Sequence, residues 1–246
     1  MHNRRLPQAL LLAAMVVASP AAAAAPQDSA GPSDEQAYHR AVGRAIDFLR
    51  TKGQATDGSY ARATGIGVTA VVTTGILRNG RSPNDPLVAK SLQYLEGFIQ
   101  PDGGIYVSGA LYRNYETCLG VLCFSEANRD GRYDKVLDDA DRFLKAGQWD
   151  EGEGHDRTSV YYGGAGYGKH ERPDMSNTQF LLEALAAAGN GPDDPAIQKA
   201  LVFVSRCQNL ETEHNTTPFA PKNPDGGFYY TAAAGGSSKA GETPNG

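Results

Sequence analysis

The stretch "SLQYLEGFIQPDGGIY", residues 91 to 106, runs from an amphipathic helix into a glycine-rich turn. Apolar residues recur along one side of the helix at the spacing of helical turns, at Val88, Leu92, Leu95 and Ile99. The Gln-Pro-Asp-Gly-Gly segment then favours a turn, because glycine permits positive φ and aspartate hydrogen-bonds the nearby backbone. We therefore predict a helix with one exposed face, a tight turn, and an aromatic residue that packs between neighbouring helices.

The same order of residues recurs along the chain. Related stretches are "AIDFLRTKGQATDGSY" (45 to 60), "DRFLKAGQWDEGEG" (141 to 154, with a degenerate ending) and "ALVFVSRCQNL" (200 to 210), the last continued after an insertion by "NPDGGFYY" (223 to 230). The glutamines of the four copies are Gln54, Gln100, Gln148 and Gln208, so successive copies lie 46, 48 and 60 residues apart. Periods of this size indicate a stacked array of helical repeats.

A second pattern marks where two of the helices begin. Pro83-Asn84-Asp85-Pro86 and Pro192-Asp193-Asp194-Pro195 lie 109 residues apart, and each is followed four residues later by a lysine, Lys90 or Lys199. An aspartate cap followed by proline in the first helical position is a strong helix start. Both helices should therefore begin at matching points of their repeats.

The helices that follow the turns differ in kind, because they are apolar on almost every side: "GVTAVVTTGIL" (67 to 77), "CLGVLCF" (118 to 124) and "FLLEALAAA" (180 to 188). Such helices must be covered on most sides. The alternation predicts an all-α fold of two concentric layers. We expect outer helices near 38 to 52, 86 to 99, 133 to 146 and 195 to 208, and inner helices near 64 to 78, 112 to 127 and 174 to 188.

This repeat is similar to the QW-type repeat of squalene cyclases, which protein prenyltransferase β-subunits share in a looser form. The chain thus resembles the prenyltransferase/squalene oxidase repeat proteins over about residues 38 to 230. The resemblance implies an α/α toroid with an apolar central cavity where the inner helices begin. A fourth inner helix does not follow "SSKAGETPNG" (237 to 246). We therefore expect an incomplete ring of about three and a half hairpins over residues 37 to 246, truncated at its C-terminus.

The N-terminal residues have the layout of a bacterial secretory signal. Arg4 and Arg5 precede a short apolar run, and small residues follow through Ala25. The apolar run is shorter than the roughly 20 residues that a membrane span needs. We predict a signal peptide over 1 to 25, a flexible leader over 26 to 36, no membrane span after cleavage, and a periplasmic or secreted protein.

Charge and cysteine content restrict the partners. The chain has 23 basic and 28 acidic residues, a net charge of −5, and no basic run, so we expect no nucleic-acid partner. Its three cysteines are Cys118, Cys123 and Cys207. The first two lie five apart in an apolar helical segment and cannot face each other, so we interpret all three as buried free thiols. We expect neither a metal nor a cofactor.

The candidate catalytic residues lie at the predicted inner-helix starts. Cyclases that protonate an alkene carry Asp-x-Asp-Asp-Thr there, and "DMSNT" (174 to 178) matches it only at Asp174 and Thr178. Ser176 stands at the position of the proton donor, and a hydroxyl cannot replace a carboxylic acid there. Asp174 can instead cap a helix. The matching starts "RNYET" (113 to 117) and "GIGVT" (65 to 69) contain a single acid, Glu116.

The long connection from Trp149 to Pro173 holds the candidate binding residues, because connections of this length in a compact helical array are often functional. The alternative is that its tyrosines only pack the loop onto the helices. The candidates are Tyr161, Tyr162, Tyr167, His155 and His170. The two histidines match no metal-ligand spacing.

Two functions remain open. The chain is either part of an exported terpenoid-cyclase-like protein that acts on or binds an isoprenoid or another lipid without the Asp-x-Asp-Asp acid, or a non-catalytic toroid that binds a protein or glycan. The apolar inner helices and aromatic side chains favour an apolar small molecule. The loss of motif residues favours the scaffold, because a fold alone does not determine function.

Overall fold

The computed structural model describes residues 32–168, 172–218, 220–222 and 224–234 of the 246-residue chain. Within these ranges the regular structure is helical, and the β pairing consists of isolated bridges. The predicted all-α class is therefore confirmed. None of the helices in the described ranges is long and apolar enough to cross a bilayer. The described residues divide into two units, one up to residue 41 and one from residue 42, and the architecture below is that of the second.

The helices follow the predicted order closely. Helix α1 begins at Pro32, earlier than expected, because a proline in the first turn followed by Asp34 and Glu35 is a favourable start. The predicted leader to residue 36 therefore overlaps this helix, whereas the predicted signal peptide lies outside the described residues. The α-helices are α1 (Pro32–Phe48), α2 (Gly67–Arg78), α3 (Pro86–Glu96), α4 (Arg113–Ala127), α5 (Asp134–Ala146), α6 (Met175–Ala187) and α7 (Pro195–Arg206).

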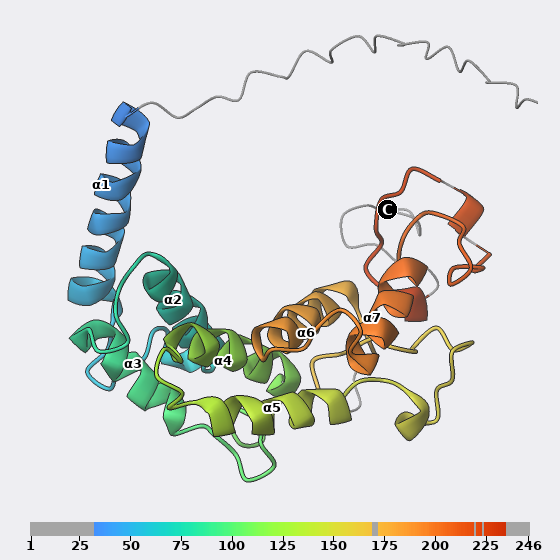
Figure 1. Ribbon diagram of the computed structural model, residues 1–246, viewed down its shortest axis with the longest axis horizontal. Helices are drawn as coiled ribbons and strands as arrows, with labels where there is room; N and C mark the ends of the chain where they lie inside the picture. Colours follow the sequence, from blue (N-terminus) through green and yellow to red (C-terminus); the bar gives the residue numbers. More distant parts are fainter. Residues whose placement is uncertain (1–31, 169–171, 219, 223, 235–246) are drawn as a thin grey trace, which may run out of the picture. The chain divides into compact units, whose positions relative to one another are not determined.

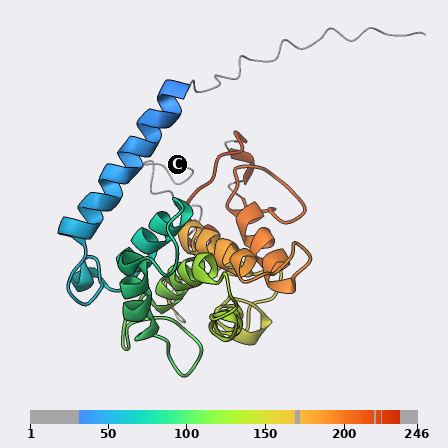
Figure 2. The same cartoon turned by 60° about the vertical axis from the view of Figure 1, so that its left-hand side comes forward.

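The second unit has two layers of helices. Helix α4 lies between α2 and α6 (Figures 1 and 2). These three, the predicted inner helices, form one layer, which we call the inner layer; α3, α5 and α7 are called the outer helices. Helix α3 packs on α2, α5 packs on α4 and α6, and α7 packs on α6. The chain thus alternates between the layers, as the sequence predicts. The Asp-Pro starts are also confirmed, because Asp85 and Asp194 cap α3 and α7 with Pro86 and Pro195 in the first turn.

The prediction that every inner helix is covered on most sides is correct only for α4. Residues Thr117 to Phe124 of α4 are all buried. Helix α2, at one end of the row, leaves Val68 and Val71 38% and 52% exposed. The physical reason is position, because only α4 has an inner-layer neighbour on both sides.

All four repeats close with the same pair of backbone hydrogen bonds. In the second repeat Gln100 N donates to Gly104 O, and Gly103 N donates to Gln100 O. The other repeats pair Ala55 with Gly58 and Ser59, Trp149 with Gly163 and Gly164, and Asn209 with Gly226 and Gly227. Each closure contains a glycine of positive φ: Gly58, Gly103, Gly163 and Gly226. The repeat inferred from sequence is therefore a repeat in three dimensions.

These closures correct the sequence alignment at two points. Gln100 occupies the position of Trp149, one residue beyond that of Gln148, so it is not equivalent to the other three glutamines. Its amide accordingly donates within its own hairpin, whereas the amides of Gln54 and Gln148 donate to carbonyls in the first turns of α3 and α7. The third repeat closes at Gly163 rather than in the 150–154 stretch, because a long excursion separates its two halves.

Three of these glycines fix how each turn meets the next outer helix. A Cβ at Gly103 would lie 2.5 Å from the Asp139 carbonyl oxygen of α5. Gly58 meets the Lys90 carbonyl of α3 in the same way, and Gly163 meets that of Lys199 in α7. Glycine is required there both for its positive φ and for the close approach of backbone to backbone.

A threonine in the first turns of each inner helix ties that helix to the turn before it. The hydroxyl oxygens of Thr69, Thr117 and Thr178 accept the backbone N–H of Tyr60, Ile105 and Ala165, at 2.9, 3.0 and 3.0 Å. These threonines end the three aligned starts "GIGVT", "RNYET" and "DMSNT". The one residue type that the starts share therefore has a structural role.

Candidate functional site

An apolar cavity of about 410 Å³ lies where the three inner-layer helices begin. This is the location that the sequence resemblance implies for a ligand. The cavity is walled by α2, α4, the first turn of α6 and Tyr167 from the preceding loop. Its lining residues are Thr64, Gly67, Val68, Val71, Val72, Tyr112, Tyr115, Glu116, Leu119, Tyr167 and Ser176.

The repeat brings equivalent positions to the same cavity. Gly67, Tyr115 and Ser176 are the third residues of the three aligned starts, and all three line it. Ser176 was considered at this position from the sequence, whereas Tyr115 was not, although its place in the aligned starts identifies it. Burial raises the pKa of Tyr115. Its hydroxyl therefore stays protonated at neutral pH.

Glu116, a predicted catalytic candidate, is in the wall of the cavity and only 4% exposed. Its Oε1 accepts the Ile66 backbone N–H at 3.2 Å, and its Oε2 accepts that of Val107 at 2.9 Å. The carboxylate thus joins the start of α2 to the turn before α4. Both of its oxygens hold the scaffold, which is the expected arrangement for a buried charge compensated by hydrogen bonds.

Aromatic rings form a chain along one side of the cavity. The Tyr167 ring lies 5.3 Å from that of Tyr112 and 6.0 Å from that of Tyr115, both edge-on. Tyr115 in turn lies edge-on to Phe180, at 5.1 Å. Of the predicted binding residues, Tyr167 is the one that the structure places at the cavity.

Tyr167 also interacts with Tyr230. The segment around Tyr230 crosses the start of α6, where Met175 N donates to Tyr230 O at 2.8 Å. Burial, together with hydrogen bonds to Tyr167 and Asp174, raises the pKa of Tyr230. Tyr230 therefore lies next to both the buried Asp174 and Tyr167.

Asp174 is the N-cap of α6, which confirms the capping interpretation. Its Oδ1 accepts the Asn177 backbone N–H at 2.9 Å, and its Oδ2 accepts the Asn177 side-chain amide at 2.9 Å. The aspartate is 2% exposed. The residue of this start that lines the cavity is Ser176. A catalytic role for Asp174 stays a prediction.

The other loop candidates pack against one another rather than around the cavity. The His155 ring stacks on Tyr161 at 4.8 Å and meets Trp149 edge-on at 5.0 Å. The Tyr162 hydroxyl donates to Glu151 at 3.1 Å. This arrangement favours the alternative that these rings pack the loop. His170 lies outside the described residues.

Two basic residues of α7 anchor this loop. Lys199 pairs with Asp150 at 2.7 Å and with Glu151 at 3.0 Å. The buried Arg206 donates to the backbone carbonyls of Arg157, Ser159 and His214. The loop is therefore fastened to the helical array by charged side chains.

The described residues contain neither a cluster of metal-binding side chains nor a reactive thiol. No group of three or more His, Cys, Asp and Glu side chains in those ranges is placed to hold a metal ion. The three cysteines are free and buried, as predicted. Burial raises the pKa of Cys123 and of Cys207 to about 12. These thiols are unreactive at neutral pH.

Comparison with known proteins assigns no function. No protein-family model matches the chain, and a search of curated proteins finds no match.

Proposed function

We propose that this chain binds a neutral apolar small molecule, an isoprenoid or another lipid, in the cavity where α2, α4 and α6 begin. The observation that carries the proposal is the cavity itself: about 410 Å³, walled by valines, a leucine and tyrosines. Apolar cavities with a few polar groups are typical small-molecule sites.

The charges around the cavity favour a neutral ligand over a diphosphate. Among the described residues that line the cavity there is no Lys or Arg, and the one acid is Glu116. A diphosphate needs cations or a metal ion to compensate its charge. Several lining residues carry a hydroxyl group, among them Ser176 and Tyr115, and a hydroxyl suits an alcohol or carbonyl group at one end of an apolar chain.

The same groups favour binding over protonation of an alkene. Ser176 stands where the acid of such cyclases would be, and a hydroxyl does not supply that proton. The Tyr115 hydroxyl at the wall, whose pKa burial raises, can donate a hydrogen bond at neutral pH. We therefore infer that the cavity holds and orients its ligand and does not protonate an alkene.

The family and the ring remain part of the proposal. The shared closures and the two helical layers support an α/α toroid of the prenyltransferase/squalene oxidase repeat type. Export to the periplasm or medium is likewise proposed, from the signal-like residues 1 to 25. A scaffold that binds a protein or glycan is the alternative.

Binding of farnesol and of farnesyl diphosphate, measured by isothermal titration calorimetry, tests the proposal. The alcohol should bind saturably and more tightly than the diphosphate. Val71→Glu should weaken farnesol binding by about tenfold or more, because the ligand would bury a charge without a partner. Leu201→Glu is the matched control, because Leu201 on α7 is similarly exposed, at 46%, but does not line the cavity.

The control variant Leu201→Glu should bind farnesol as tightly as the unmodified protein does. The proposal fails if the unmodified protein does not bind farnesol, if Val71→Glu binds it equally well, or if the diphosphate binds more tightly. Failure of farnesol together with capture of a glycan would favour the scaffold.

A further inference from the structure

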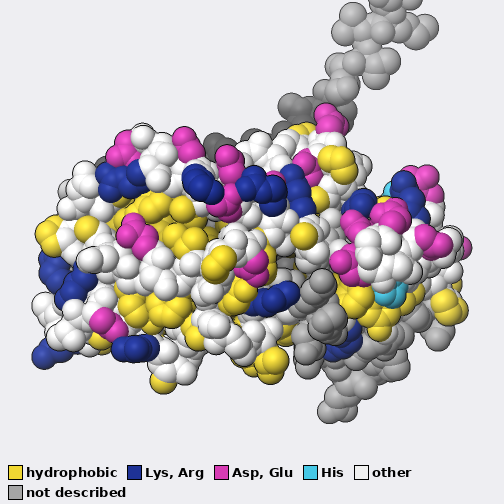
Figure 3. Space-filling model, turned by 90° about the horizontal axis from the view of Figure 1, so that it is seen from below, with side chains coloured by type: hydrophobic (Ala, Val, Ile, Leu, Met, Phe, Trp, Pro, Cys, Tyr) yellow, Lys and Arg dark blue, Asp and Glu magenta, His cyan; other side chains and the backbone are white. Residues whose placement is uncertain are grey.

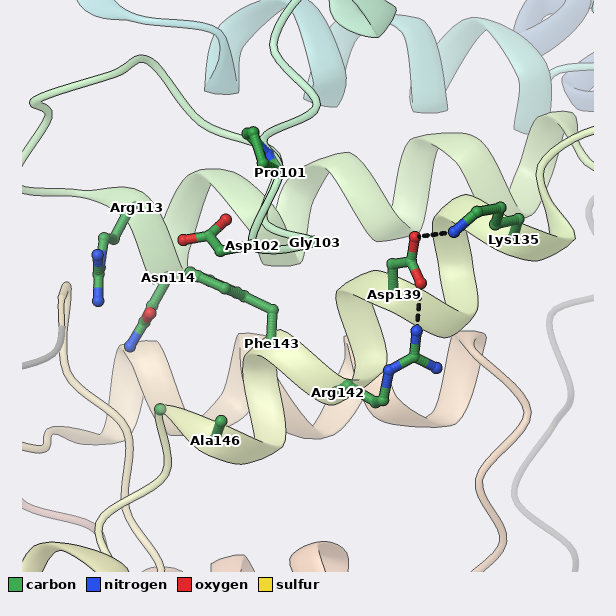
Figure 4. A pocket seen from close by; sticks show the side chains of 11 residues that line it. Pro101, Asp102, Gly103, Arg113, Asn114, Lys135, Asp139, Arg142, Phe143 and Ala146 are labelled. Atoms are coloured by element: carbon green, nitrogen blue, oxygen red, sulfur yellow. Dashed lines mark hydrogen bonds and ion pairs between the residues drawn. The ribbon is translucent and has the colours of Figure 1, made fainter.

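A second cavity, of about 600 Å³, shares no lining residue with the apolar one. It is a groove between the turn at residues 101–103, the start of α4 and one side of α5 (Figure 4). Arg113 lies at one end of the groove, and the group Lys135, Asp139 and Arg142 lies at the other, with Phe143 between them. Its chemistry is therefore polar and charged.

Arg113, the first residue of α4, is held by two aromatic rings. Its guanidinium carbon lies 5.6 Å from the centre of the Phe143 ring and 5.9 Å from that of Tyr106. These two rings stack on each other at 5.6 Å with an angle of 29° between their planes. Gly104 permits the arrangement, because a Cβ there would overlap the Tyr106 ring and lie 3.0 Å from Phe143. A guanidinium placed in this way loses little entropy when it binds an anion.

The acids of the groove are already engaged elsewhere. Asp102 accepts the Gly104 backbone N–H at 3.1 Å and the Tyr106 hydroxyl at 2.6 Å. Asp139 pairs with Lys135 at 2.7 Å and also with Arg142. Within the described residues no acid forms an ion pair with Arg113.

The three cations of the groove therefore exceed its two carboxylates by one charge, on a protein whose net charge is −5. Arg113, which has no ion pair among the described residues, is also the cation that the aromatic rings hold in place. Arginine presents N–H groups in a planar fork that matches a carboxylate or phosphate.

We propose that this groove binds the oxyanion, carboxylate or phosphate, of a small ligand, with Arg113 paired to the anion and the ligand body against Phe143. The site is independent of the apolar cavity and does not rest on the function proposed for it. It gives the chain two chemically distinct binding sites, one neutral and apolar and one anionic.

Titrations followed by amide chemical shifts in NMR test this site with three probes: benzoate, phenyl phosphate and benzyl alcohol. One or both anions should bind at least about tenfold more tightly than the alcohol, because a hydrogen-bonded charge pair is lost with the neutral probe. The shifts should cluster at residues 102–104 and around Phe143. The tighter anion identifies the ligand as a carboxylate or a phosphate.

Three variants locate the interaction. Arg113→Gln should weaken binding of the anion by about tenfold, and Arg113→Lys should recover part of it because the charge remains without the planar fork. Arg132→Gln is the control, because Arg132 is exposed, pairs with Asp130 and does not line the groove. It should bind like the unmodified protein.

Circular dichroism melts establish that each variant is folded, and Arg113→Lys provides a test of geometry if Arg113→Gln does not fold. The inference is overturned if neither anion saturates the protein, if benzyl alcohol binds as tightly as the anions, or if a folded variant without the Arg113 guanidinium keeps full affinity.

Discussion

Replacing Gly103 with alanine tests whether the repeat turns are packed as tightly against the next outer helix as the structure indicates. Gly103 has a φ of +90°, and a Cβ there would lie 2.5 Å from the Asp139 carbonyl oxygen and 3.0 Å from its carbon. Gly80 provides a matched control. Its φ is +86°, and a Cβ there would have no neighbour within 4 Å.

The two substitutions share one cost and differ in another. Each places a side chain in the left-handed region, which costs about 1 to 2 kcal/mol. At Gly103 the new Cβ would also be about 0.8 Å closer than a carbon–oxygen contact of about 3.3 Å allows, so α5 must move away. Displacing a packed element in this way costs about 1 to 3 kcal/mol.

Gly103→Ala should therefore be less stable than Gly80→Ala by about 2 kcal/mol, or roughly 4 to 8 °C in Tm for a chain of this size. Urea unfolding followed by circular dichroism measures the free energies, and a thermal melt measures the Tm. Equal stability of the two variants would refute the reasoning, because strain in φ would then explain the whole effect and the close approach to α5 would contribute nothing.

Other features of the array give predictions of similar size. Thr117→Val should lower stability by about 1 to 3 kcal/mol in urea, because it leaves the buried Ile105 N–H without its acceptor, whereas Thr117→Ser should restore most of the loss. Glu116→Gln should lower the free energy of unfolding by about 1.5 to 3 kcal/mol, because an amide cannot accept from both backbone donors, Ile66 N–H and Val107 N–H. An unchanged urea midpoint would contradict this structural role of Glu116. Stability should also fall as pH rises above 9.0, because the unfolded chain releases thiol protons there while Cys123 and Cys207 keep theirs until about 12. Urea midpoints measured against pH should show a shallower fall when both cysteines are replaced by alanine.

The order of the helices was readable from the sequence because it depends on local chemistry. The Asp85-Pro86 and Asp194-Pro195 starts predicted the first residues of α3 and α7, since a cap and a first-turn proline act within a few residues. The apolar spacing predicted three buried positions of α3, Val88, Leu92 and Leu95, whereas the fourth, Ile99, lies beyond the end of the helix at Glu96.

What the sequence did not predict depends on contacts between distant residues. Glutamine spacing misplaced Gln100 by one position, because the backbone closures rather than the glutamine define the repeat. The exposed side of α2 follows from its place at the end of a row, which periodicity does not encode. Tyr115 was missed as a cavity residue because acidic side chains were the expected catalytic groups at the inner-helix starts. The packing of His155 against Trp149 and Tyr161 depends on how the loop folds on itself.

The excursion in the third repeat has a consequence for how this chain can change. Trp149 N donates to Gly164 O and Gly163 N donates to Trp149 O, so the excursion leaves and returns at adjacent points of the backbone. In the second repeat the same closure spans only Gln100 to Gly103. Because the two ends are fixed to each other, the length between them can change without altering the register of α5 and α6, provided that the contacts of the excursion with Lys199 and Arg206 of α7 are kept. The third repeat is therefore a position where new sequence can be introduced while the helical array stays as it is.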